Sequence, residues 1–304
     1  MKIAVIVITY NDDYKFSEWC KWYEEYKDQV SLYVIVDNNS CQEYKEKVQS
    51  YFKEAHFIWR ESNGGCTSAY NDGIRYALSQ HEITHIALVG NDIRLSDNCL
   101  IRCAELLDAD SKLGMISPVL LNDNSSVVGD FGCGISEDLT MVPHGKGVNV
   151  NELKVSFRYC DALTGGINIS KRSFYETVGL QDENLFMYSD EVDMALRAMK
   201  YGIKMAATSE VKAWHQHINS PIVVKRHPYS AFLIARNKVY LSYKHFGKAK
   251  ARKVFNQFFY SGFKNYMMNI FRFDFNKAQS SRWRMIGAWK GLKGDMKENK
   301  YSHL

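Results

Sequence analysis

Short apolar runs rich in β-branched residues alternate with helical patterns over the first hundred residues. The runs that we expect to form strands are 3–9, 31–37, 56–59 and 85–90. Between them, apolar residues recur at three- and four-residue spacings, which is the periodicity of amphipathic helices. This alternation predicts a mostly parallel α/β sheet flanked by helices on both faces. Binding sites in such sheets lie beyond the carboxyl ends of the strands.

The second half of the chain changes character. After a less regular stretch, an acidic first turn opens a predicted helix over 190–201, and Gly202 stands where a C-cap glycine belongs. From about residue 225 onward the pattern predicts only helices. We therefore expect an α/β domain over 1–222 and a C-terminal helical extension over 223–304.

Charge separates the helical extension from the rest. Residues 244–300 hold 14 Lys or Arg against 3 acids, a net of +11, while the whole chain is only +5, so the remainder carries about −6. Phe, Tyr, Trp and Met are interleaved with these cations, and Arg282 and Trp283 are expected on the helix that would lie at the interface. A cationic, aromatic helix suits an anionic membrane surface. The alternative is a helical subdomain with a solvated charged face. With no nucleic-acid-binding motif present, we expect no nucleic acid partner.

Apolar runs and cysteines bear on the compartment. No run approaches the ~18 uncharged apolar residues of a membrane span, and the β-branched N-terminus looks like a strand, so we expect a cytoplasmic protein, soluble or peripheral on the inner membrane face. The seven cysteines include no CxxC pair. A zinc site or a disulfide framework is therefore not expected, which fits a reducing compartment.

Polar clusters stand at the predicted strand ends. They are Thr9-Tyr10-Asn11, Asp37-Asn38-Asn39-Ser40, Asn63-Gly64-Gly65 and Asn91-Asp92. A carboxylate such as Asp37 can accept from a ribose hydroxyl or a base N–H, and Asp92 can hold Mg²⁺ or Mn²⁺ against a diphosphate. Ordinary polar turns remain the alternative for each cluster.

Three carboxylates crowd the start of the 190–201 helix. The helix dipole favours each by only about 0.3–1 kcal/mol, and a cap explains one of them. A general base needs one carboxylate aimed at an acceptor hydroxyl, which makes Asp190 and Glu191 the candidates. Asp193 could instead pair with Arg197 one turn later. His215 follows the next predicted strand and, when neutral, is a suitable ligand for Mn²⁺, although a structural histidine is the alternative.

Taken together, these residues resemble the inverting family 2 glycosyltransferases of the GT-A fold, most closely the rhamnosyltransferase and galactofuranosyltransferase branch. The resemblance covers about residues 3–246. The motifs that carry it, in the family's order, are VITYND, VDNNS, SNGGCTSAYNDGI, LVGNDI, LTGG, GLQDENLFMYSDEVDMALRAMKYG, AWH and ARNKVYLSYKHF.

The resemblance implies a nucleotide-sugar donor, a divalent Mn or Mg ion and a role for each matching residue. Glu191 would be the base, with Asp190 as the alternative, and Asp92 and His215 would hold the metal. Arg236 and Asn237 would contact the diphosphate or lock their helix. The implied substrate-binding set is Thr9, Tyr10, Asn11, Asp37, Asn39, Asn63, Gly65, Asn71, Gly73, Asn91, Thr164, Gly165, Gly166, Arg236 and Asn237.

Two positions depart from the family pattern. The metal motif often reads DxD, but its first position here is Gly90, so metal binding should depend more on His215. The base is Glu rather than the commoner Asp.

The acceptor expected from the basic tail is a glycan or a polyprenyl-diphosphate-linked sugar of a surface polysaccharide. Two other functions remain open: a non-catalytic glycan-binding scaffold of the same fold, and a nucleotidyltransferase, whose usual Gly-rich basic loop is missing after the first strand.

Overall fold

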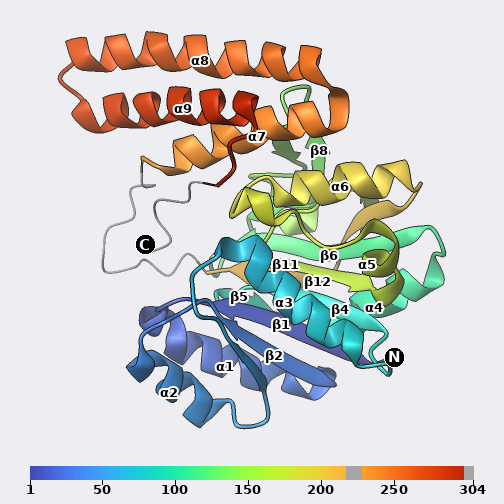
Figure 1. Ribbon diagram of the computed structural model, residues 1–304. Coiled ribbons are helices and arrows are strands. Elements are labelled where there is room, and N and C mark those ends of the chain that lie inside the picture. The colour runs from blue at the N-terminus through green and yellow to red at the C-terminus, as the bar shows by residue number, and fades with distance from the viewer. Residues whose placement is uncertain (217–227, 298–304) are drawn as a thin grey trace.

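The computed structural model describes residues 1–216 and 228–297. Its centre is a mixed, mostly parallel sheet in the order β10-β12-β6-β11-β4-β1-β2-β3 (Figure 1). The strands are β1 Ile3–Thr9, β2 Leu32–Asp37, β3 His56–Trp59, β4 His85–Val89, β6 Leu113–Asn122, β10 Phe157–Cys160, β11 Ile167–Lys171 and β12 Lys204–His215. Two short strands extend the sheet, β5 Ile93–Leu95 beside β12 and β7 Val128–Asp130 beside β6, and β8 Cys133–Ile135 pairs with β9 Met141–Pro143 in a separate hairpin.

The strands β3, β2, β1, β4, β6 and β12 run in one direction, whereas β11 and β10 run against their neighbours. The expected α/β fold is thereby confirmed.

Helices cover both faces of the sheet, because side chains of buried parallel strands point alternately to either side. Val5 and Val7 face the core beneath α1 Phe16–Tyr26, α2 Gln42–Tyr51 and α4 Cys99–Ala109. Ala4 and Ile6 face the opposite core, beneath α3 Gly65–Ser79, α5 Arg172–Val178 and α6 Asp190–Lys200.

A layer of three helices lies over the α6 side of the sheet (Figure 1). It consists of α7 Ser230–Phe246, α8 Lys248–Phe271 and α9 Phe275–Lys293. Ala235 and Val239 of α7 share a small core with Val254 of α8 and Ala288 of α9. The expected C-terminal helices are confirmed, whereas the proposed boundary between 222 and 223 lies outside the described residues.

Trp283 lies on α9, and its ring meets Tyr229 and Phe232 edge-on at centroid distances of 5.3 and 5.9 Å. The side chain therefore anchors α9 to the start of α7.

Candidate active site

Asp37 is a fully buried carboxylate at the carboxyl end of β2, directly beside Thr9 at the end of β1. Its Oδ1 accepts a hydrogen bond from the backbone N–H of Ser40 at 2.9 Å, and the Lys45 ammonium lies 3.7 Å from the same atom. Oδ2 is buried and has no hydrogen-bond partner within 1–216 and 228–297. An unmet buried acceptor costs about 1–3 kcal/mol, so this oxygen is suited to a ligand donor.

Thr9, Tyr10 and Asn11 hold the loop after β1 in shape. The Thr9 hydroxyl shares a hydrogen bond with the Tyr44 hydroxyl at 2.7 Å, and the Tyr10 N–H donates to Asp12 at 3.3 Å. Asn11, with a positive φ of 50°, accepts from the Cys41 N–H at 2.9 Å. These hydrogen bonds therefore fix the shape of the loop after β1.

Asn38, outside the predicted set, ties the loop after β2 to the glycine turn before α3. It donates to Asn63 at 2.8 Å and accepts from the Gly64 N–H at 3.1 Å. The neighbouring Asn39 is exposed, with φ at 72°, and is free to meet a ligand. The only sequence signal for Asn38 was the pair of asparagines after β2. In the structure the Asn38 side chain is buried and the Asn39 side chain is exposed.

Gly65 serves close packing at the start of α3. It has a φ of +81°, and a Cβ there would lie 2.1 Å from the Phe186 carbonyl oxygen. Any side chain would push α3 away from the turn that precedes α6.

Asn71 and Gly73, both in the expected substrate-binding set, have packing roles within the protein. Asn71 is buried and donates to the Gln181 carbonyl and to Glu183, both at 2.9 Å. A Cβ on Gly73 would lie 2.4 Å from Ile6, because α3 packs there directly on the sheet. Both residues therefore position α3.

Asp92 and His215 converge although 123 positions separate them in the sequence. β12 pairs with β5 so that His215 stands opposite Ile93, and the Gln216 N–H donates to the Asp92 carbonyl at 2.9 Å. The His215 Nε2 consequently lies 3.5 Å from Asp92 Oδ2.

A lysine that the motifs did not identify completes this cluster. Lys15, just before α1, places its ammonium 3.0 Å from Asp92 Oδ2 and 3.3 Å from Asn91 Oδ1. Burial alone would raise the pKa of Asp92, but hydrogen bonds and charge from His215 and Lys15 outweigh it and hold the pKa well below its ordinary value. Asp92 is thus built to stay ionised beside a cation.

The donor set at Asp92 fits a divalent ion in part. One carboxylate and one imidazole suit Mn²⁺, which would need further oxygens from a diphosphate and water. Within the described part of the chain, no group of three or more His, Cys, Asp or Glu is gathered for a metal. The Lys15 ammonium shares the same carboxylate, so a metal would compete with it.

The Thr164-Gly165-Gly166 turn connects the Asp92 loop to Glu191. The Gly165 N–H donates to Glu191 Oε1 at 3.1 Å, and a Cβ on Gly165 would lie 2.8 Å from that oxygen. The Gly166 carbonyl accepts from the Gly90 N–H at 2.7 Å. Thr164 points away, to a hydrogen bond with Asp130. Gly165 and Gly166 therefore connect the segment that carries Asp92 to the side chain of Glu191.

Asp190 and Glu191 form a coupled pair at the start of α6. Burial and then the Glu191 charge raise the pKa of Asp190 well above its ordinary value. Burial also raises the pKa of Glu191, although hydrogen bonds from its own backbone N–H, from Asp190 and from Gly165 act against this rise. Burial and mutual repulsion therefore hold the two carboxyl groups, as a pair, toward the protonated state.

Asp193 points to the other side of α6, as the structural interpretation expected. It bonds Arg197 at 2.9 Å and the His245 and Lys244 side chains at 2.7 Å each. Burial would raise the pKa of Asp193, but these partners lower it to about 2.

The turn before α6 is strained. Phe186, Tyr188 and Ser189 all have positive φ, between 62° and 71°, which is unfavourable for residues other than glycine. Asn237 holds the turn: its amide donates to the carbonyls of Leu185, Met187 and Tyr188 at 3.0, 2.9 and 2.8 Å.

Arg236 belongs to the same lock. It is fully buried and donates to the carbonyls of Asn184 and Leu185 at 3.2 and 3.1 Å. Of the two alternatives for Arg236 and Asn237, these hydrogen bonds show the locking role, while a contact with substrate stays a prediction. A helix about 45 residues downstream thus fixes where the acid pair points.

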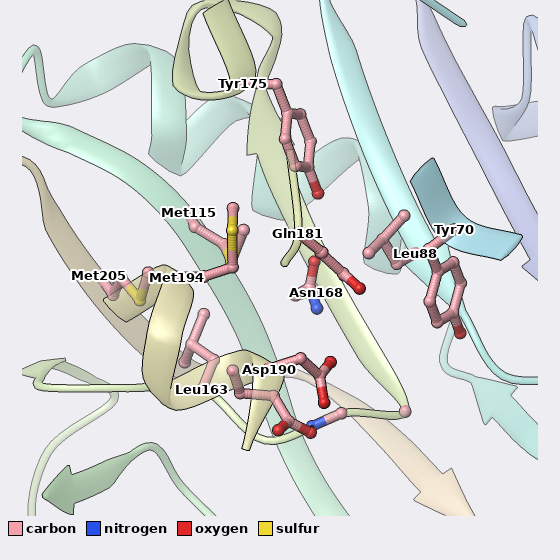
Figure 2. Close-up of a pocket in the computed structure, with 13 residues that line it drawn as sticks. Tyr70, Leu88, Met115, Leu163, Asn168, Tyr175, Gln181, Asp190, Met194 and Met205 are labelled. Atoms are coloured by element: carbon pink, nitrogen blue, oxygen red, sulfur yellow. The ribbon is translucent and has the colours of Figure 1, made fainter. Parts of the chain in front are cut away.

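A small cavity of about 40 Å³ lies behind the acid pair (Figure 2). Met115, Met194 and Leu163 line one side of it, and Asn168 and Gln181 line the other. The side-chain oxygens of Asn168 and Gln181 are buried and lack a hydrogen-bond partner in the described ranges. This volume suits one or a few water molecules and is too small for a sugar ring.

Comparison with known families agrees with this site. The sequence model described as glycosyl transferase family 2 matches residues 4–127, which include Thr9, Asp37 and Asp92. Over these residues the chain is similar to the family 2 glycosyltransferases.

Two curated relatives carry related activities in their names. The chain is 26% identical over 213 residues to the dTDP-rhamnosyl transferase RfbF of Shigella flexneri, covering 70% of this chain and 68% of the relative. It is 25% identical over 225 residues to the low-salt glycan biosynthesis hexosyltransferase Agl10 of Haloferax volcanii, covering 72% and 70%.

Solved structures extend the likeness of fold to the entire chain. GalNAc-T7 with UDP, GalNAc and Mn²⁺ matches 100% of this chain and 57% of its own at 12% identity, with a TM-score of 0.62. The mannosyltransferase PcManGT of Pyrobaculum calidifontis with GDP-Man and Mn²⁺ matches 98% of this chain and 88% of its own at 14% identity, with a TM-score of 0.56. The GT-A fold is thereby shown for this chain.

Proposed function

We propose that this protein is a glycosyltransferase that moves a sugar from a nucleoside-diphosphate sugar to an acceptor hydroxyl with inversion at the anomeric carbon. The supporting observation is the pair of unlike carboxylate clusters joined by the Gly165–Gly166 turn. Asp92 is paired with cations and suits the diphosphate end of the donor, whereas Glu191 holds its hydrogen bond to Gly165 and suits the acceptor end.

In this reaction Glu191 accepts the proton of the acceptor hydroxyl. The oxygen then bonds to the anomeric carbon as the bond from that carbon to the diphosphate oxygen breaks, and the configuration inverts in one displacement. A divalent ion held by Asp92 and His215 would neutralise charge on the leaving diphosphate. Lys15 stabilises the same charge from the protein side, since its ammonium already lies at Asp92.

The donor end is supported by the strand-end loops. The unmet Oδ2 of Asp37 can accept from a base N–H or a ribose hydroxyl, and exposed Asn39 lies beside it. Because RfbF is named a dTDP-rhamnosyl transferase, dTDP-rhamnose is the first donor to test. A glycan, or a polyprenyl-diphosphate-linked glycan on the cytoplasmic face of the membrane, is the proposed acceptor.

A thermal-shift panel of nucleoside diphosphates, each with and without Mn²⁺, tests the donor site. A ligand that binds only the folded protein raises the melting temperature by mass action. We expect one nucleobase to give the largest rise and Mn²⁺ to increase it. If no nucleotide shifts the melting temperature and no sugar donor releases its nucleoside diphosphate, the chain is a glycan-binding scaffold instead.

A further inference from the structure

The outer face of α8 changes from basic to apolar along its length. Its first half exposes Lys248, Arg252 and Lys253, and the second half exposes an apolar stripe at helical spacing. That stripe consists of Tyr260, Phe263, Met267, Met268 and Phe271. The two halves of one helix face thus present different chemistry to solvent.

The turn between α8 and α9 continues the apolar stripe. Phe271, Phe273 and Phe275 are 76, 79 and 65% exposed, although phenylalanine is usually buried. We call Tyr260, Phe263, Met267, Met268, Phe271, Phe273 and Phe275 the aromatic tip. Figure 1 shows α8 as the outermost helix of its layer and this turn at the far end of the hairpin.

Cations surround the aromatic tip. Residues 248–293 contain 11 Lys or Arg and a single acid, Asp274, whose carboxylate is paired with Lys277 at 2.9 Å. Lys264 and Arg272 lie among the exposed phenylalanines. Such a surface attracts anionic headgroups, at about 1 kcal/mol per cation, and offers apolar rings to the acyl boundary below them.

We propose that α8 docks on an anionic membrane surface, with the aromatic tip inserted at the headgroup boundary and the basic half of α8 lying on the headgroups. No helix in the described ranges is long and apolar enough to cross a bilayer, so the contact is interfacial. A nucleic acid would also meet the cations, but Phe and Met tip residues offer it no hydrogen bonds, and they suit hydrocarbon.

The docked helix is joined firmly to the active site. α8 packs on α7 through Val254 and Val239, and Asn237 of α7 bonds the turn that carries the acid pair. A membrane-docked tip therefore fixes the distance of Glu191 from the membrane plane. This inference concerns surface binding and stands whether or not the proposed transfer chemistry is correct.

Vesicle cosedimentation tests the proposal with the full chain. We expect binding to phosphatidylcholine vesicles that contain phosphatidylglycerol, weaker binding without the anionic lipid, and loss of binding as salt rises. The triple variant Phe263→Ser, Phe271→Ser, Phe273→Ser should lower the partition coefficient at least about tenfold. The matched control, Tyr159→Ser with Tyr201→Ser, removes aromatics that are 50 and 60% exposed on the α/β body and should bind like the native chain.

Melting temperatures of all variants show whether each remains folded. A second variant, Lys264→Gln with Arg272→Gln, should weaken binding to anionic vesicles only. The proposal is overturned if the native chain binds neither vesicle, if the folded triple variant binds as well as the native chain, if the native chain prefers single-stranded RNA over anionic vesicles, or if the triple variant changes only the oligomeric state. Nucleotide shifts and transfer to a soluble acceptor, measured on the same variants, test the proposed function separately.

Discussion

Asp92 and the Asp190–Glu191 pair are carboxylate clusters of one site with opposite electrostatics. Asp92 faces Lys15 and His215, and its pKa is held down. Within residues 1–216 and 228–297, Asp190 and Glu191 form no ion pair with a cation, and burial raises both of their pKa values. Environment alone thus prepares one cluster to hold a cation and the other to hold a proton.

The two clusters are also built differently. Asp92 follows a buried strand and needs only the pairing of β5 with β12 to meet His215. The acid pair follows a strained turn that depends on Asn237 from a distant helix. The sheet therefore positions Asp92, the cation-holding side of the site. Hydrogen bonds from Asn237 of α7 position Asp190 and Glu191, the proton-holding side.

The largest expected effect comes from removing the proton acceptor. Glu191→Gln should lower transfer about 10²–10⁴-fold, the usual contribution of a general base. It should leave the Mn²⁺-dependent nucleotide shift intact, because Asp92 is untouched. Initial rates and thermal shifts measure the two effects, with exposed Glu137→Gln as the control. Retained transfer would assign the base to Asp190.

Breaking the lock should disturb only the proton-holding side. Asn237→Ala removes two N–H donors that are shared among three carbonyls, and also the hydrogen bond that Oδ1 accepts from Arg236. At about 1 kcal/mol for each of these three groups, it should lower the free energy of unfolding by about 3 kcal/mol. Urea unfolding measures this change. Ser242→Ala, also buried on α7 and with one hydrogen bond, is the matched control. An equal loss in both variants would show that Asn237 has no special role.

Asp92→Asn should weaken Mn²⁺ binding at least about 10–100-fold and abolish the metal-dependent part of the nucleotide shift. Lys15→Met should act in the opposite direction and strengthen Mn²⁺ binding, because the competing ammonium is gone. Titration of Mn²⁺ in the presence of nucleoside diphosphate separates the two. If Asp92→Asn leaves the metal dependence unchanged, the cation-holding side has been assigned to the wrong residue.

The smallest effect concerns the stored proton. Because the folded-state pKa of Asp190 is raised, its stabilising contribution is full below the ordinary pKa and is lost as pH rises through the raised value. Asp190→Asn should therefore gain stability relative to the native chain as pH rises, by about 1.4 kcal/mol for each unit of the pKa shift. Urea unfolding at several pH values measures the difference in free energy of unfolding between Asp190→Asn and the native chain. If that difference does not change with pH, the raised pKa of Asp190 is contradicted.

The sheet could be predicted from sequence because each strand carries its own pattern. The β-branched runs ending at Thr9 and Asp37 are local signals, and they lie side by side in register as parallel strands require. The acid cluster at the start of α6 was equally local, since crowded carboxylates cannot be explained by capping alone.

The contacts that the motifs left unresolved are tertiary. Lys15 reaches Asp92 from 77 positions away, and Asn237 reaches Tyr188 from 49 away. The spacing of residues around Asn237 in the sequence does not show whether its amide donates hydrogen bonds to backbone carbonyls or to a phosphate. For the same reason Gly73 looked like part of a ligand loop, although its missing side chain admits Ile6.

The hydrogen bonds from Asn237 to the turn before α6 limit how this protein can be engineered. Residues 228–297 cannot be exchanged between relatives as an independent module, because they include the residue that holds this turn. A graft that replaced α7 would have to bring its own 185–189 segment, and a chain cut after β12 would keep the strands of the sheet yet release the left-handed turn that aims Glu191.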